Sequence, residues 1–256
     1  MTLDQYAAVF FRDQLRAARA RVLANAEDFE GVVQALERLG RFLAPGHGFG
    51  LGALADTLSG LAQNSPLART VPQGRSDYHH EVSALLESVR VARNMAIHEG
   101  ALARRLAAHS VECALIFEDA LEANMKTVGN FMVRNPVEAA AWHPLSFVRQ
   151  AMLTGSFSYL PVRIPGVQEG AWRLVADASL ARALRGAVGQ DARARMLGMS
   201  LEDAVSQNYL ELETPDMAQV DTPIQEVAGK LGSVPILVMS RDGMELVGIV
   251  TAFDLL

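Results

Sequence analysis

The sequence predicts an α+β protein with two domains. An N-terminal helical bundle is expected over residues 1–127, and a C-terminal region over residues 128–256 contains two copies of a helix-strand-strand-helix unit. In the N-terminal part, apolar residues recur at three- and four-residue steps, which is the period of amphipathic helices. In the C-terminal part, the order helix, strand, hairpin turn, strand and helix start occurs twice, about 75 residues apart, which indicates an internal repeat. The two copies are expected over about 128–190 and 197–256.

Five helices are expected in the bundle. Their apolar stripes run over Leu3–Val22, Phe29–Leu43, Leu51–Leu61, Tyr78–Ala96 and Leu102–Leu121. The first stripe includes Tyr6 and Phe10, and the fourth helix is expected to begin at Ser76-Asp77. Helices joined by short loops pack antiparallel into a bundle, and Val128-Gly129-Asn130 is the expected linker to the second domain.

The elements of the two repeat copies follow the same signals. In the first copy, a helix opens at Pro144, followed by a strand over Tyr159–Ile164, a turn at Pro165-Gly166, a strand over Trp172–Val175 and a helix over about Asp177–Leu184. In the second copy, a helix with proline at its first position spans Thr222–Val227, followed by a strand over Val234–Met239, a turn over Ser240–Gly243 and a strand that ends at Thr251.

The end of that last strand carries the most informative polar residues. Thr251 stands at an expected helix start, and Asp254 follows three residues later. The first N–H groups of a helix have no partner within the helix, so this position suits a phosphate. Thr251 could hydrogen-bond the phosphate, and Asp254 could accept hydrogen bonds from ribose hydroxyls. The alternative is that both residues are ordinary helix caps.

Composition limits the classes of function. The chain has 256 residues and a formal net charge of -6, which counts against sequence-independent nucleic-acid binding because that binding depends on Lys and Arg. The single cysteine, Cys113, is expected in the helical core and fits a reducing compartment. Residues 43–68 are interrupted by glycine and proline and cannot form one continuous membrane span. No signal peptide is recognised at the N-terminus, so a cytoplasmic protein is expected.

The two strands Leu160-Pro161-Val162 and Val234-Pro235-Ile236, with the terminal segment Gly248-Ile249-Val250-Thr251-Ala252-Phe253-Asp254-Leu255, carry a family resemblance. Through them, the region from Val128 to Leu256 resembles the cystathionine-β-synthase (CBS) domain family. Its members fold as tandem pairs, which implies two β-α-β-β-α repeats here. The resemblance implies a regulatory module, and no metal is expected because the sequence contains no credible cluster of metal ligands. The ligand of this module would be an adenine nucleotide (AMP, ADP or ATP) or S-adenosylmethionine, bound in clefts between the two repeats.

Carried over position by position, the resemblance implies one competent cleft. Thr251 would contact phosphate and Asp254 the ribose, while backbone groups near Thr222 and around Val234, Pro235 and Ile236 would hold the adenine. The first copy departs from this pattern, because Ala176 and Ser179 stand where Thr251 and Asp254 stand in the second. Asp177 could replace the missing carboxylate only in part, because it directly follows Ala176, whereas Asp254 stands three residues after Thr251.

A homodimer is expected from the way in which the chain ends. Leu256 lies one turn into the helix that closes a repeat in this family. Apolar surface is therefore expected to be left for a partner subunit or an extension to cover, and CBS pairs commonly dimerise face to face.

A second resemblance lies in the N-terminal half. Arg93, Asn94 and His98 match the Arg-x4-His signature of the HEPN superfamily, helical bundles that include metal-independent ribonucleases. There the histidine would move a proton at the RNA 2′-hydroxyl and the arginine would steady the charged phosphorus intermediate, giving a 2′,3′-cyclic phosphate. On an ideal helix Arg93 and His98 stand about 140° apart, whereas Arg90, Asn94 and His98 share one band. The alternative is a solvated helix face.

Three functions follow from these observations. The leading hypothesis is a homodimeric sensor in which adenine-nucleotide binding by the CBS pair controls the helical domain, which would contact a protein or RNA partner. The second is a nucleotide-regulated HEPN-type endoribonuclease. The third is a structural dimerisation protein whose ligand clefts have both decayed.

Overall fold

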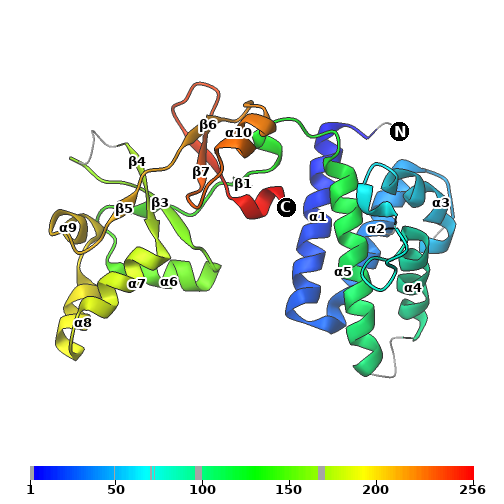
Figure 1. The fold of residues 1–256 in the computed structure, drawn as a ribbon, viewed down its shortest axis with the longest axis horizontal. Helices are drawn as coiled ribbons and strands as arrows, with labels where there is room; N and C mark the ends of the chain where they lie inside the picture. The colour runs from blue at the N-terminus through cyan, green and yellow to red at the C-terminus, as the bar shows by residue number, and fades with distance from the viewer. Residues whose placement is uncertain (1–2, 49, 70, 72, 96–99, 167–170) are drawn as a thin grey trace. The chain divides into compact units, whose positions relative to one another are not determined.

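The computed structural model describes residues 3–48, 50–69, 71, 73–95, 100–166 and 171–256, and only the backbone of residues 92–95 and 100–103. The chain divides into two compact units, Met1–Met125 and Lys126–Leu256. The division falls two residues before the predicted boundary. The first unit is helical and the second combines two small sheets with helices, which confirms the predicted α+β class (Figure 1).

The first unit is a bundle of α-helices. In the described residues these are α1 (Gln5–Ala24), α2 (Glu30–Leu43), α3 (Leu51–Ala62), α4 (Val82–Met95) and α5 (Gly100–Glu122), with short 3₁₀ turns over Ala26–Phe29 and Pro66–Ala68. Helix α1 packs along α2 and α5, and α4 packs along α3 and α5 (Figure 1). Each predicted stripe corresponds to one of these helices. Cys113 is fully buried in α5, as expected, and burial raises the pKa of its thiol to about 12.

Two details of the bundle differ from the prediction. On α1 the buried face contains Ala8 and Phe11, whereas Tyr6 and Phe10 are exposed. Phe11 and Ala8 lie four and seven residues before the buried Leu15, which is helical spacing. The predicted period is therefore correct, but the choice of Tyr6 and Phe10 as buried residues is wrong. The fourth helix begins at Val82 rather than at Ser76-Asp77. The chain before it forms turns, and the backbone N–H of His80 donates to a carboxylate of α5, that of Glu112 (2.6 Å).

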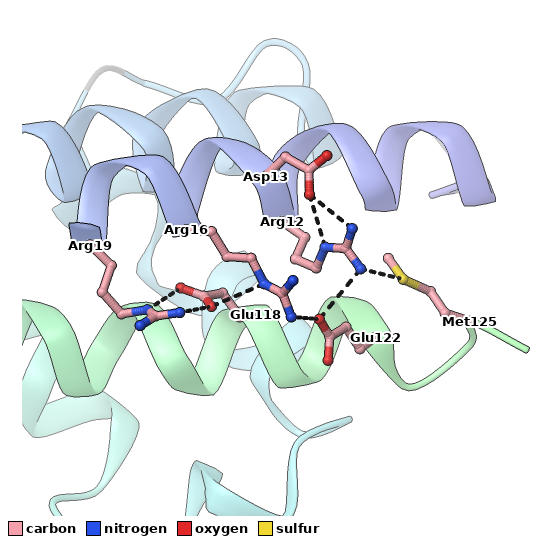
Figure 2. Close-up of polar contacts among 7 residues, drawn as sticks. All are labelled: Arg12, Asp13, Arg16, Arg19, Glu118, Glu122 and Met125. Carbon is pink, nitrogen blue, oxygen red and sulfur yellow. Dashed lines mark hydrogen bonds and ion pairs between the residues drawn. The ribbon is translucent and has the colours of Figure 1, made fainter. Parts of the chain in front are cut away.

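Ion pairs join α1 to α5 along one side of the bundle. Arg19 donates two hydrogen bonds to Glu118, from Nε (2.8 Å) and Nη2 (2.9 Å). One turn away, Arg16 donates to Glu122 (2.8 Å), and Arg12 lies 3.5 Å from the same carboxylate. Figure 2 shows the three arginines of α1 directed at the two glutamates of α5. The hydrogen bond with Glu118 raises the pKa of Arg19. Burial raises the pKa of Glu122, although the charges of Arg16 and Arg12 act to lower it.

The second unit contains two four-stranded sheets. One has the order β2 (Ala139–Ala140), β3 (Tyr159–Arg163), β4 (Trp172–Ala176) and β5 (Leu212–Glu213). The other has the order β1 (Val133–Arg134), β8 (Leu246–Val250), β7 (Ile236–Met239) and β6 (Met217–Gln219). The helices are α6 (Leu145–Gly155), α7 (Asp177–Gly186), α8 (Gln190–Gly198), α9 (Leu201–Ser206) and α10 (Ile224–Lys230), with 3₁₀ turns over Val128–Asn130 and Ala252–Leu255.

These elements form two equivalent copies. One copy is β2-α6-β3-β4-α7, and the other is β6-α10-β7-β8 followed by the turn Ala252–Leu255. In each, the first strand pairs parallel with the second, and the second pairs antiparallel with the third. The repeat predicted from the sequence is therefore present in the structure, in the predicted order of elements.

The two copies exchange strands. Strand β1 lies just before the first copy along the chain, yet it pairs antiparallel with β8 of the second copy. Strand β5 lies just before the second copy, yet it pairs antiparallel with β4 of the first. Each sheet therefore borrows its fourth strand from the segment that leads into the other copy. This exchange places β1 beside β8, and the chain after β1 runs toward the start of β8 at Val247.

The central strands β4 and β7 are buried along their whole length. On one face of β4, Val175 packs with Leu160 and residues of the helices of its own copy. On the other face, Trp172 and Leu174 pack against Leu237 and Met239 of β7. We call these four residues the inter-sheet cluster, because they join the two sheets. Among the described residues, no helix is both long enough and apolar enough to cross a membrane.

Candidate functional site

A cavity of about 570 Å³ lies between the two copies, next to the end of β8. Three segments line it: residues 133–137, which include β1 and the chain after it; residues 156–160, which lead into β3; and the end of β8 with the turn after it. The last segment contributes Ile249, Thr251, Phe253 and Asp254, and Pro235 adds one side chain from the start of β7. The volume is in the range of small-ligand sites.

Local backbone structure shapes two of these walls. Asn135, just after β1, has a left-handed backbone (φ 49°) and its N–H donates to the carbonyl of Val247 (3.2 Å), which holds the first segment against β8. Ser156 ends α6 in a left-handed conformation (φ 53°). The next N–H, that of Phe157, donates back to Met152 (2.9 Å). This turn presents residues 156–160 to the cavity.

Thr251 and Asp254 are in direct contact with each other. The backbone N–H and the hydroxyl of Thr251 both donate to Oδ2 of Asp254, each at 2.8 Å. The Asp254 side chain is 9% exposed. The expected helix start is a 3₁₀ turn of four residues, Ala252–Leu255, so few peptide dipoles align there and a macrodipole contributes little. Thr251 and Asp254 therefore cap this turn and also line the cavity.

The predicted adenine-binding segment divides between two places. Pro235 lines this cavity, whereas Thr222, Val234 and Ile236 are not among its lining residues. The hydroxyl of Thr222 accepts from the N–H of Gln219 (3.0 Å) in the turn between β6 and α10. In the first copy, His143 Nδ1 accepts from Ala140 N (3.0 Å) in the equivalent turn.

The packing of the two sheets against each other explains this division. The strand start of the first copy, Tyr159 and Leu160, lines the cavity together with Thr251 of the second copy. Tyr159 packs against the inter-sheet cluster. The sequence offered no signal for this, because packing between sheets joins residues that are far apart in the chain.

The corresponding position in the first copy has different polar contacts. Ala176 is buried at the end of β4, and Ser179 in α7 is 3% exposed. The Ser179 hydroxyl accepts from Arg182 Nη2 (2.9 Å), so a neighbouring side chain already uses it. Asp177 is exposed, and its backbone N–H donates to the carbonyl of Ser158 (2.9 Å). Ser179 and Arg182 instead border a separate cavity of about 640 Å³ beside α8.

The HEPN-type residues cannot be assembled into a site from the described chain. His98 lies outside the described residues, and so do the side chains of Arg93 and Asn94, whose backbone belongs to α4. The proposed proton transfer and phosphate contacts therefore stay predictions.

A polar cluster between α4 and α5 was not foreseen from the sequence. His80 Nδ1 lies 2.9 Å from Glu112 Oε2, and Ser88 Oγ lies 2.6 Å from His109 Nδ1. The two imidazole rings are 4.8 Å apart. Burial lowers the pKa of His109, and the nearby His80 lowers it further. In the described part of the chain, no three His, Cys, Asp or Glu side chains are placed to hold a metal ion.

Gly155→Ala should disturb one wall of the cavity. A Cβ at Gly155 would overlap the ring of Phe157. We expect the Phe157 ring to move and the second unit to lose about 1–3 kcal/mol, the usual effect of overpacking. Urea unfolding followed by tryptophan fluorescence measures this, because Trp142 and Trp172 both lie in the second unit.

Gly186→Ala is the matched control, since Gly186 also ends a helix and a Cβ there would meet nothing within 4 Å. It should be neutral or stabilising, because alanine is the better helix former. If both substitutions change the free energy of unfolding equally, the ring of Phe157 does not restrict the space at Gly155.

Comparisons with known proteins found similar solved structures only. No protein-family model matches the chain, and no curated protein matches it. The structure of CBSX2 in complex with AMP is 21% identical over 50% of this chain and 91% of that chain, with a TM-score of 0.36. CBSX2 from Arabidopsis thaliana is 19% identical over 50% and 89%, with a TM-score of 0.38.

A putative acetoin utilization protein (AcuB) from Vibrio cholerae is 18% identical over 50% of this chain and 86% of that chain, with a TM-score of 0.37. These three structures give no support to the HEPN resemblance of the N-terminal half.

Proposed function

We propose that the second unit is a CBS-type pair that binds one adenosine-containing ligand in the cavity beside Thr251 and Asp254. We further propose that binding controls the helical unit in a homodimeric regulatory protein. The observation that carries the first proposal is a cavity of about 570 Å³ between the two copies. The paired hydroxyl and carboxylate of Thr251 and Asp254 line it together with β1 and with the strand start of the first copy.

The lining suits the parts of a nucleoside. An ionised carboxylate only accepts hydrogen bonds, so Asp254 can accept from the two ribose hydroxyls. Apolar side chains, among them Val137, Phe157 and Ile249, offer surface for a purine ring. Asn135 and Ser158 add polar groups that could fix the orientation of the base. A mostly apolar cavity with few convergent polar groups is the usual form of a ligand site.

The proposal of a single site rests on the difference between the copies. In the first copy the carboxylate is replaced by Ser179, whose hydroxyl accepts from Arg182. A ribose there would lack a carboxylate at the position that corresponds to Asp254. Regulation additionally requires that the ligand bind two arrangements of the protein with different affinities, so the helical unit must differ between the free and bound states.

Asp254→Asn should weaken binding of the adenosine ligand by roughly 10- to 100-fold, because hydrogen bonds to a charged group contribute about 1.5–3 kcal/mol. Asparagine keeps one acceptor oxygen for Thr251, so the turn should persist. The measurement is calorimetric titration of the full chain with AMP, ADP, ATP and S-adenosylmethionine, with GTP as the mismatched base. Asp242→Asn, at the hairpin tip and away from the cavity, should bind like the parent protein.

Ligands without one ribose hydroxyl complete a double-mutant cycle. The 2′-deoxy and 3′-deoxy ligands should bind the parent more weakly than the full ligand and should lose less in Asp254→Asn. The proposal of a nucleotide site is refuted if none of the adenosine ligands binds the parent, or if Asp254→Asn binds them equally well. The proposal of regulation fails separately if ligand binding leaves hydrogen exchange in α1–α5 unchanged.

A further inference from the structure

The charges around the cavity suggest which adenosine ligand it accepts. All of its lining residues belong to the described part of the chain, and among them Arg134 is the one Lys or Arg and Asp254 the one Asp or Glu. Two more carboxylates stand just outside. Glu138 follows the lining residue Val137, and the N–H of Asp177 donates to the carbonyl of Ser158. Both of these side chains are exposed. In the described chain, these two carboxylates thus flank a lining that contains one cation and one carboxylate.

Arg134 lines the cavity, and one of its guanidinium nitrogens has a backbone partner. Its backbone is part of β1, opposite Gly248 of β8. Its side chain donates from Nη2 to the carbonyl of Gly129 (2.8 Å), which ties the guanidinium to the turn before β1. A guanidinium has five N–H donors in a planar fork, so this bond leaves donors for a phosphate. Planar bidentate contacts with phosphate are the interaction to which arginine is best suited.

We propose that this site selects an adenosine ligand with a single phosphate, which Arg134 contacts, over ligands with two or three phosphates. The proposal rests on the proposed function, because it assumes that the ribose lies at Asp254. One phosphate meets one cation. Each further phosphate adds negative charge close to Asp254, Glu138 and Asp177, and the lining residues supply no second cation. Like charges placed close together disfavour binding, and the discrimination should therefore decrease with added salt.

The test is an affinity series on the full chain with adenosine, AMP, ADP and ATP, the last two with and without Mg²⁺, at low and at moderate salt. AMP should bind about tenfold or more tightly than either ADP or ATP. Arg134→Gln should reduce the affinity for AMP to that for adenosine, and the affinity for adenosine itself should not change. Arg134→Lys keeps the positive charge and should retain part of the preference for AMP. Arg149→Gln, an exposed arginine on α6 that does not line the cavity, is the matched control.

The outcomes separate this proposal from the one on which it rests. If ADP or ATP binds as tightly as AMP, the selectivity is refuted while the nucleotide site stands. If AMP binds the parent and Arg134→Gln equally well, the role of Arg134 is refuted. If no adenosine compound binds the parent at all, the nucleotide site and its selectivity are both refuted. A melting curve without ligand establishes that each variant is folded before its affinity is compared.

Discussion

Replacing Glu118 with alanine is expected to destabilise the helical unit by about 3 kcal/mol, because breaking a buried ion pair leaves its partner's charge uncompensated. Glu118 is 5% exposed and accepts two hydrogen bonds from Arg19, while Arg16 lies 3.6 Å away. Figure 2 shows both arginines directed at this carboxylate from α1. Without it, Arg19 would lose both of these hydrogen bonds on the side of α1 that packs against α5, while Arg16 would keep its bond to Glu122.

The expected loss is placed at the lower end of the range for buried pairs. The side chains of Arg19 and Arg16 are 18% and 28% exposed, so each can turn partly toward water when Glu118 is removed. Glu118→Gln should cost less than Glu118→Ala, since the amide oxygen still accepts a hydrogen bond from Arg19 and the side chain keeps its volume.

Chemical denaturation followed by circular dichroism measures this effect, together with hydrogen exchange resolved to single helices. Amides of α1 and α5 should exchange faster, and those of α6 and α7 should be unaffected. Glu87→Ala is the control, because Glu87 pairs with Arg90 on the exposed surface of α4. Such pairs contribute about 0–1 kcal/mol. If Glu118→Ala cost no more than Glu87→Ala, the ion pairs between α1 and α5 would not stabilise the bundle.

Leu237→Ala should destabilise the second unit by about 2–5 kcal/mol, the range for a leucine removed from a packed core. Leu237 is fully buried on β7, where it belongs to the inter-sheet cluster with Trp172, Leu174 and Met239. The two sheets meet through this cluster, so the space left by the side chain can close only if one sheet shifts against the other. The cost should therefore include a cavity as well as lost hydrophobic burial.

Tryptophan fluorescence is a local probe for this substitution. Trp172 is 8% exposed within the cluster, whereas Trp142 is 70% exposed, so most of the change on unfolding should come from Trp172. Urea titration provides the free energy of unfolding. Leu153→Ala, at a side chain that is 64% exposed on α6, should change stability by about 0.5 kcal/mol or less. A Leu237→Ala effect as small as that control would mean that the two sheets do not depend on each other for stability.

Local sequence patterns were sufficient to predict the elements. Helical periodicity located the five helices of the bundle, since burying one stripe of an amphipathic helix requires that spacing. The hydrophobic strands, each followed by a turn or a capped helix, revealed two copies of one unit. The sequence did not determine which residues of a predicted helix face the core. Phe10 and Phe11 are adjacent and equally apolar, and only packing against α2 and α5 decides that Phe11 is buried and Phe10 is exposed.

The position of Thr251 and Asp254 at the end of β8 was also available from the sequence, because their spacing is a local matter within one turn. Which residues they face was not. That depends on the packing of the two sheets and on β1, a two-residue strand that the local pattern does not mark and that pairs with β8 far along the chain. The ion pairs between α1 and α5 have the same origin: Arg19 and Glu118 are 99 residues apart, and no spacing rule connects them. The sequence by itself determined the elements and their repeat, since these depend on neighbouring residues. Tertiary structure alone decided the composition of the site, since that depends on which strands pair.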